Sequence, residues 1–353
     1  MKVESTANKV LSVVLSALMF AVSAAAVWAV VSDYATRDIV AKGAALVGHD
    51  LTGMTPAQVR ATIDEYVSTP VMRPLTVAGD DKTWVLDPKG IVTVDTDAMT
   101  AEAYSPSRNA TLVERLISRV NDKPLPVDVK PVYSVDTSTL AGWVKQRATD
   151  VDRPPVNAKR DVVDHGIHIT PAVYGATVEQ TRAVDQISHV LTSDAARSSA
   201  SKVTSLAITV VTPSVVASSF GNAIVVSLSE CRIRLFSGDQ LVKEYPCAPG
   251  QPAWPTPKGD FRIVNKQANA PWINPNSAWS ASMPPMIPGG PGNPMGDRKI
   301  AINVPGVFMH GIPRSEYGSI GSHASHGCMR MMPSAVHDLY GRVNIGDPVF
   351  IRN

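Results

Sequence analysis

The densest group of potentially reactive side chains lies near the carboxyl end of the chain. Met309-His310-Gly311 is followed by a segment from Gly321 to Arg330 that contains His323, His326 and Cys328. A cysteine attacks as its thiolate, and a free thiol with a pKa of about 8.5 is mostly protonated at neutral pH. It therefore needs a neighbouring base or positive charge, which the histidines can supply. The pattern predicts acyl transfer with Cys328 as the nucleophile.

The neighbours of Cys328 have the types that acyl transfer requires. Gly327 leaves the backbone uncrowded, so the amides of Gly327 and Cys328 can point at a developing oxyanion. Arg330 can hold a substrate carboxylate. His326 is two residues from Cys328, so in an extended chain the two side chains would run parallel. His310 ends an apolar run that can form a neighbouring strand, and it is the predicted general base.

This segment resembles the signature of the L,D-transpeptidase catalytic domain, the YkuD family. That signature is His-Gly, then Gly-x-x-x-Ser-His-Gly-Cys, and usually a hydrophobic residue and Arg. A second family feature, Pro-Thr-Pro-x-Gly-x-Phe, is matched by the residues from Pro255 to Phe261, and the similarity runs from about Ala223 to the C-terminus. The resemblance implies a mostly β catalytic domain, an L,D-transpeptidase-like β-sandwich, that acts on peptidoglycan stem peptides without a metal or an organic cofactor.

The resemblance also implies roles for individual residues. Cys328 would be the nucleophile and His310 its base, with the Gly311 carbonyl orienting the imidazole. The residues implied in oxyanion stabilisation and substrate binding are Ser325, His326, Gly327 and Arg330. Trp254, Trp272 and Trp279 are interpreted as core residues, with a place in the cleft as the alternative.

By the same resemblance, Cys328 attacks the third, diamino residue of a tetrapeptide stem, expels D-alanine and passes the acyl group to another stem as a 3→3 cross-link. Carbapenems are expected to acylate the same thiol. Three alternatives remain: an L,D-carboxypeptidase that uses water, a cysteine peptidase of ordinary proteins, and a non-catalytic wall-binding protein. A zinc site is disfavoured, because the step from His326 to Cys328 does not have a standard zinc-ligand spacing.

Composition and cysteine content narrow the class of protein. With 353 residues, 44% hydrophobic and 18% charged, the chain should fold into more than one domain. A net charge of +2, without a basic block, argues against nucleic acid as a partner. Cys231 and Cys247 lie at nearly matching distances from the Gly238-Asp239 turn, which predicts a disulfide between them. Cys328 would then be the free thiol.

Residues 10–31 carry no charge and are long enough to cross a bilayer core of about 30 Å. They are predicted to form a transmembrane helix or signal anchor. Lys2 and Lys9 precede this stretch, which favours a cytoplasmic segment over residues 1–9 and a catalytic domain on the extracytoplasmic, cell-wall side of the cell membrane. The alternative is a cleaved signal peptide.

The central part of the chain is predicted to form two small α+β domains, residues 44–125 and 126–212. Each shows a helix followed by a strand, and the first helix begins with a capping box over Thr55-Pro56-Ala57-Gln58. The pair resembles the tandem peptidoglycan-binding domains of some L,D-transpeptidases; a stalk without a ligand is the alternative. Residues 193–205 are predicted to be a loop, 213–222 a linker and 223–353 the catalytic domain, in which 284–296 is a lid or cleft loop.

Overall fold

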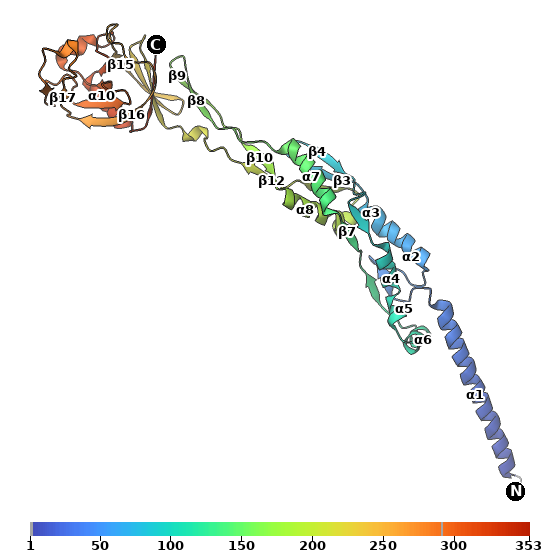
Figure 1. The fold of residues 1–353 in the computed structure, drawn as a ribbon. Coiled ribbons are helices and arrows are strands. Elements are labelled where there is room, and N and C mark those ends of the chain that lie inside the picture. Colours follow the sequence, from blue (N-terminus) through green and yellow to red (C-terminus); the bar gives the residue numbers. More distant parts are fainter. Residues whose placement is uncertain (1–2, 291) are drawn as a thin grey trace. The chain divides into compact units, whose positions relative to one another are not determined.

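The computed structural model describes residues 3–290 and 292–353. The chain divides into two compact units (Figure 1). The amino-terminal unit comprises the chain up to Arg153 together with residues 176–209. The barrel unit comprises residues 154–175 and 210–353. Because the chain passes from one unit to the other more than once, neither is a single continuous stretch.

The first helix, α1 (Val3–Thr36), is the part of the chain with the properties of a membrane span (Figure 1). Its segment from Asn8 to Thr36 has a mean hydropathy of 2.4, and none of its most apolar window is buried in the protein. At about 1.5 Å per residue this helix exceeds the thickness of a bilayer core. Among the described residues it is the one helix long and apolar enough to cross a membrane, a property that a signal sequence shares.

The first of two hydrophobic clusters in the amino-terminal unit includes Leu46, Ile63, Met99 and Val129. The predicted capping box is present, with Gln58 accepting from the Thr55 amide. The elements that contribute are β1 (Ala44–Leu46), β2 (His49–Asp50), α2 (Pro56–Ile63), a continuing π-helical turn (Asp64–Ser68), α4 (Thr96–Ala103) and β6 (Val127–Val129). Strand β1 pairs antiparallel with β2 and parallel with β6. The short helices α5 (Ser105–Asn109) and α6 (Leu112–Val120) follow α4.

The second cluster of this unit includes Leu75, Leu140, Val144 and Ile187. Helix α7 begins as predicted at Asp136, whose carboxylate accepts from two backbone amides of the first turn. The remaining elements are α3 (Thr69–Val71), β3 (Leu75–Ala78), β4 (Thr83–Leu86), β5 (Val92–Val94), β7 (Tyr133–Val135), α7 (Thr137–Val151), β10 (Gly175–Val178), α8 (Gln180–Thr192), α9 (Asp194–Ser198), β11 (Lys202–Ser205) and β12 (Ile208–Val211).

The two clusters interleave along the chain, so the predicted boundary between residues 125 and 126 does not separate them. Strand β3 lies before this boundary, yet it pairs in parallel with β11, which lies far after it. The predicted loop over 193–205 therefore contains a helix and a strand. The segment was expected to be a loop because it is polar, but the ammonium of Lys202 is buried and donates to the Val71 carbonyl at 2.7 Å.

The barrel unit is mostly β, as predicted, and eight of its strands close into a barrel. Closure leaves no unpaired edge strand in this sheet. In the order in which they neighbour one another, the strands are β13 (Asn222–Ser227), β14 (Arg232–Ser237), β15 (Gln240–Ala248), β21 (Met329–Met331), β20 (Phe308–His310), β19 (Arg298–Ile302), β16 (Gly259–Ala268) and β22 (Pro348–Arg352).

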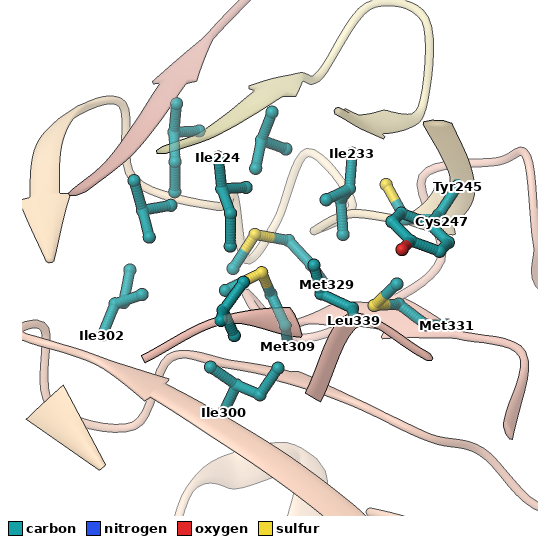
Figure 2. Packing of buried hydrophobic residues seen from close by; sticks show 14 of the residues in the cluster. Ile224, Ile233, Tyr245, Cys247, Ile300, Ile302, Met309, Met329, Met331 and Leu339 are labelled. Atoms are coloured by element: carbon teal, nitrogen blue, oxygen red, sulfur yellow. The ribbon is translucent and has the colours of Figure 1, made fainter. Parts of the chain in front are cut away.

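The interior of the barrel is filled by aliphatic and sulfur-containing side chains. Figure 2 shows Met309, Met329 and Met331 in the same cluster as isoleucines of several strands. Helix α10 (Pro333–Arg342) adds Leu339 to this cluster. Thioether side chains fill irregular gaps well. The same alternation that buries these residues turns their sequence neighbours outward, where the candidate site is found.

A hairpin from residues 154–175 packs on the outside of the barrel. Strands β8 (Lys159–Val163) and β9 (Gly166–Thr170) contribute Ile167 to a small cluster with Ala223, Val225 and Phe236. The predicted second α+β domain included this hairpin. Its apolar residues instead belong to the barrel unit, because they complete the outer face of β13 and β14.

Cys231 and Cys247 lie opposite each other, as the sequence predicted, with the Cys247 amide donating to the Cys231 carbonyl at 2.9 Å. Both thiols are nevertheless free and buried, so the predicted disulfide is not present in the structure. Cys231 has a left-handed φ of 53°, and its thiol donates to the Leu228 carbonyl at 3.7 Å. The left-handed backbone turns this side chain away from the geometry of a simple cross-strand pair.

The capping segment (residues 269–290 and 292–296) covers one end of the strands that carry the site. The short strands β17 (Trp272–Ile273) and β18 (Met286–Ile287) pair within it. The Asn274 and Asn293 side chains each donate to backbone carbonyls of the segment at 2.9–3.3 Å. These hydrogen bonds hold the described part of the predicted lid loop over 284–296 in place. Residue 291 of this loop lies outside the described residues.

Candidate active site

The candidate site is built on three neighbouring strands whose residues are in register. Lys299 of β19 pairs with His310 of β20, and His310 pairs with Arg330 of β21. Their neighbours Ile300 and Met309 are buried in the barrel core. Since side chains alternate between the two faces of a sheet, the three basic residues share the outer face.

Cys328 belongs to the same face, two residues before Arg330. His310 and Cys328 both line one cavity of about 560 Å³, together with Lys299 and Arg330. The prediction that a neighbouring strand brings His310 to the cavity of Cys328 agrees with this arrangement. The cavity has the size of a pocket for a peptide fragment or a small molecule.

The His310 side chain is buried and has a defined tautomer. Its Nδ1–H donates to the Gly311 carbonyl at 2.6 Å, the contact expected from the sequence. A carbonyl only accepts, so Nδ1 carries the proton and Nε2 has the free lone pair. Burial lowers the His310 pKa to about 4, with Arg330 and Lys299 lowering it further and the Gly311 contact opposing the shift. The ring is therefore a neutral base at pH 7.

The Cys328 thiol is also neutral in this structure. Its Sγ–H donates to the Gly306 carbonyl at 3.3 Å. Burial raises the thiol pKa to about 11, which the Phe308 amide and the positive charges of Arg330 and Lys299 only partly oppose. The sequence led us to expect a thiolate held by a cationic partner. The physical reason for the difference is that the cavity desolvates the sulfur more than its cationic neighbours stabilise it.

A network of buried hydroxyls fixes the turn that precedes Cys328. The Ser325 hydroxyl donates to the Cys328 carbonyl and accepts from the Gly327 amide at 3.1 Å. The Thr256 hydroxyl donates to the Gly327 carbonyl at 3.0 Å and accepts from the Gly250 amide at 2.8 Å. Gly327 has a φ of 106°, which favours glycine. The Pro-Thr-Pro motif thus holds the nucleophile's turn in place.

The same network corrects one expectation about the oxyanion hole. The Gly327 amide was expected to point at a developing oxyanion, but it is bound to the Ser325 hydroxyl. Ser325 is almost fully buried, so its role in this structure is to shape the turn. An oxyanion hole that used the Gly327 amide would first have to break this hydrogen bond.

Aromatic rings hold His326 at the wall of the cavity. The imidazole is stacked on Trp279, with ring centroids 4.2 Å apart, and lies 4.6 Å from Trp254. Trp272 and Trp279 both line the cavity, so the cleft alternative applies to these two tryptophans. Burial and the charge of Arg330 lower the His326 pKa. His326 is therefore an uncharged, aromatic part of the wall.

Two cations give the cavity its charge. Arg330 forms an ion pair of 2.8 Å with Glu316 and is oriented by it. Lys299 lies half-buried with its ammonium 4.7 Å from the centre of the Phe308 ring, and burial lowers its pKa. No local pattern in the sequence points to Lys299, because its place beside His310 depends on the register of β19 and β20. Both cations can attract a substrate carboxylate.

His323 is not part of the cavity lining, and its Nδ1 is 3.0 Å from the Gly250 carbonyl. The described residues contain no group of three or more His, Cys, Asp or Glu side chains that could hold a metal ion. The zinc interpretation therefore has no geometric support in the described part of the chain.

Two family models match the chain. Residues 221–351 match the L,D-transpeptidase catalytic domain (YkuD), and residues 84–199 match the family described as "Putative peptidoglycan binding domain". The chain carries an L,D-transpeptidase catalytic domain. A peptidoglycan-binding domain lies N-terminal to it, and that single match crosses the boundary at which two tandem domains were predicted.

Curated relatives are similar to part of this chain. A "Putative L,D-transpeptidase YkuD" of Bacillus licheniformis is 34% identical, covering 36% of this chain and 64% of that protein. A "Probable L,D-transpeptidase ErfK/SrfK" of Escherichia coli is 30% identical, covering 36% of this chain and 43% of that protein. The chain thus spans less than two thirds of the length of these relatives.

Solved structures of L,D-transpeptidases are also among the matches. The structure of an Enterococcus faecium L,D-transpeptidase mutant is 16% identical and covers 82% of this chain and 99% of that one, with a TM-score of 0.32.

Proposed function

We propose that this protein is a membrane-anchored L,D-transpeptidase that joins two peptidoglycan stem peptides by a 3→3 cross-link. The observation that carries the proposal is the placement of Cys328 in one cavity with His310, whose Nδ1 is bound to Gly311 and whose Nε2 is therefore a free base. The family match supports transpeptidase chemistry on peptidoglycan. The cysteine mechanism is our inference from this geometry.

The neutral thiol and neutral imidazole define the proton transfers of the proposed reaction. As the Cys328 sulfur attacks the carbonyl of the third stem residue, Nε2 of His310 takes the thiol proton. The C–N bond to D-alanine then breaks, and His310 returns this proton to the leaving amine. A thioester remains on Cys328. The amine of a second stem attacks it, His310 takes a proton from that amine, and the thiol is regenerated as the C–S bond breaks.

The cations of the cavity fit substrates that carry carboxylates. A tetrapeptide stem has a terminal carboxylate on the D-alanine that leaves, within a few bonds of the scissile carbonyl. Arg330 and Lys299 lie on either side of His310, so one of them can hold this carboxylate while the other remains near the sulfur. The apolar wall of Trp272 and Trp279 would lie against the rest of the stem.

The acceptor distinguishes this proposal from its alternatives. Purified tetrapeptide stems are incubated with the full chain in detergent, and products are identified by mass spectrometry. A cross-linked dimer supports the transpeptidase, and a tripeptide alone identifies an L,D-carboxypeptidase. Unchanged stems, with an unmodified Cys328, would contradict both activities and leave a wall-binding role or a peptidase of ordinary proteins. The Cys328→Ser variant is the control, because it removes the nucleophile with little change in size.

Two further parts of the proposal concern location and inhibition. We propose that α1 anchors the protein in the cell membrane with both units on the cell-wall side, which the peptidoglycan-binding match supports. Fractionation with membranes and an intact N-terminus would support the anchor; an N-terminus beginning after about Ala26 would identify a cleaved signal.

We also propose that carbapenems acylate Cys328, since a strained β-lactam carbonyl is an electrophile for the same thiol. Intact-mass analysis of the wild type and Cys328→Ser tests this.

A further inference from the structure

Helix α6 has an apolar face that the protein leaves uncovered. Its apolar residues recur along one stripe of the helix, and several are exposed: Leu112 by 39%, Val113 by 62%, Ile117 by 47% and Val120 by 68%. Apolar side chains gathered on one exposed face are unusual on a soluble protein and mark an interaction surface. A strongly amphipathic helix of this kind is typical of a segment that lies in a membrane interface.

The polar side of α6 is bound to the end of α1. Arg115 donates both Nε and Nη2 to the Asp33 carboxylate at 2.9 Å, and Arg119 forms a second ion pair with Asp33 at 3.3 Å. All three side chains are mostly shielded from water. A bidentate pair shared by two arginines fixes position and direction. Helix α6 is therefore held at the level of Asp33.

Asp33 lies where α1 would leave the bilayer. Trp28 and Tyr34 flank this position and are exposed, and the Arg37 guanidinium lies 4.1 Å from the centre of the Tyr34 ring. Tryptophan and tyrosine gather at the membrane–water boundary, and arginine marks its aqueous side. The level at which α6 is held is thus the expected level of the boundary itself.

The direction in which the apolar stripe of α6 faces is also consistent with a position at the membrane boundary. Residues advance by about 100° around a helix, which places Arg115 and Arg119 roughly a quarter turn or more from the centre of the stripe, and Ser118 on the opposite side. Ser118 lines a cavity of about 340 Å³ with Lys42, Thr52 and Gly53, which lie in the segments flanking β1 and β2. The stripe therefore points away from the body of the amino-terminal unit, while α1 lies beside it.

From this arrangement we infer that α6 lies in the outer interface of the bilayer that α1 spans, with its apolar stripe inserted among the lipids. The occupant of the exposed face is the lipid surface itself. The inference rests on the proposed membrane anchor. Helix α6 is short, and its capping box, in which Glu114 accepts from the Thr111 amide at 2.8 Å, stabilises it before it meets lipid. Together, α1 and α6 would fix the amino-terminal unit against the membrane at two points.

Fluorescent depth measurement on the full chain in phosphatidylglycerol and phosphatidylethanolamine vesicles tests the inference. An environment-sensitive dye is placed on Val113→Cys in a Cys328→Ser background. Val85→Cys on β4 is the matched control, since it is 66% exposed in the same unit. We expect a blue shift and a loss of intensity with nitroxide lipids at position 113, and quenching only by aqueous iodide at position 85. Val120→Cys repeats the measurement on the same stripe.

A label on Phe20→Cys separates this inference from the anchor on which it rests. If the label on α1 responds to nitroxide lipids while those at Val113 and Val120 respond only to iodide, α6 lies in water and the inference is wrong although the anchor stands. If the label on α1 also responds only to iodide, the anchor is wrong and the inference falls with it.

Discussion

The protonation state of Cys328 can be tested by its rate of alkylation. With a pKa of about 11, roughly 300-fold less of the thiol is ionised at pH 7 than for a free thiol with a pKa of about 8.5. A thiolate of higher pKa is more nucleophilic, by about tenfold for this difference. Iodoacetamide should therefore modify Cys328 about 30-fold more slowly than free cysteine at pH 7, and the rate should rise with pH up to about 11.

Peptide mass spectrometry measures this rate for Cys328 separately from the two buried thiols, and urea-unfolded protein is the control. His310→Ala should leave the alkylation profile nearly unchanged, because a neutral imidazole does not hold the thiolate, yet it should slow acylation by stem peptides about 10²–10⁴-fold. Acylation by the wild type should be lost only as the pH falls towards about 4, where His310 becomes protonated. Alkylation faster than that of free cysteine at pH 7, and abolished in His310→Ala, would show a thiolate–imidazolium pair and refute this reasoning.

Three further predictions use contacts away from the reacting atoms. Lys299→Met should slow Cys328 alkylation at neutral pH, because the nearby positive charge that favours the thiolate is gone, whereas Lys299→Arg should retain the alkylation rate. Thr256→Val should lower the free energy of unfolding by about 1–3 kcal/mol in chemical denaturation, since it leaves two buried backbone groups unpaired, and Thr256→Ser should be close to wild type. A thiol reagent should count one cysteine in the native protein and three after unfolding without reductant; a count of one in both would mean that Cys231 and Cys247 are joined.

The parts of the candidate site that could be proposed from the sequence depend on short-range patterns. Cys328, His310 and Gly311 stand in motifs, and the apolar run before His310 indicated the strand that presents it. Lys299 was missed because its position beside His310 arises from a strand pairing that no local pattern encodes. The neutral thiol was missed for a related reason, since desolvation depends on the capping segment and on the depth of the cavity. The oxyanion role of Gly327 failed because the Ser325 hydroxyl competes for its amide.

The fold, too, was predicted where it depends on local sequence and missed where it depends on distant strand pairs. The capping box at Thr55, the strands of the barrel and the turn at Gly238 were visible as local patterns. The domain boundary in the amino-terminal unit was not, because β3 pairs with β11 and β1 with β6 across long stretches of chain. Parallel strand pairs need such long crossover connections. A division of the chain into consecutive segments therefore places the two paired strands in different domains. Closure of the barrel likewise depends on pairs of strands that are distant from each other in the sequence.

The two asparagines whose side chains hold the capping segment together also affect where this segment can deamidate. Asparagine deamidates when the nitrogen of the following residue attacks its side-chain amide and forms a succinimide. Asn274 is followed by Pro275 and Asn293 by Pro294, and a proline nitrogen has no hydrogen to lose in that reaction. The amides that hold the wall of the cavity are thus those least able to deamidate. In long-lived protein, any deamidation of this segment should begin at Asn269 or Asn276, whose side chains do not hold it together.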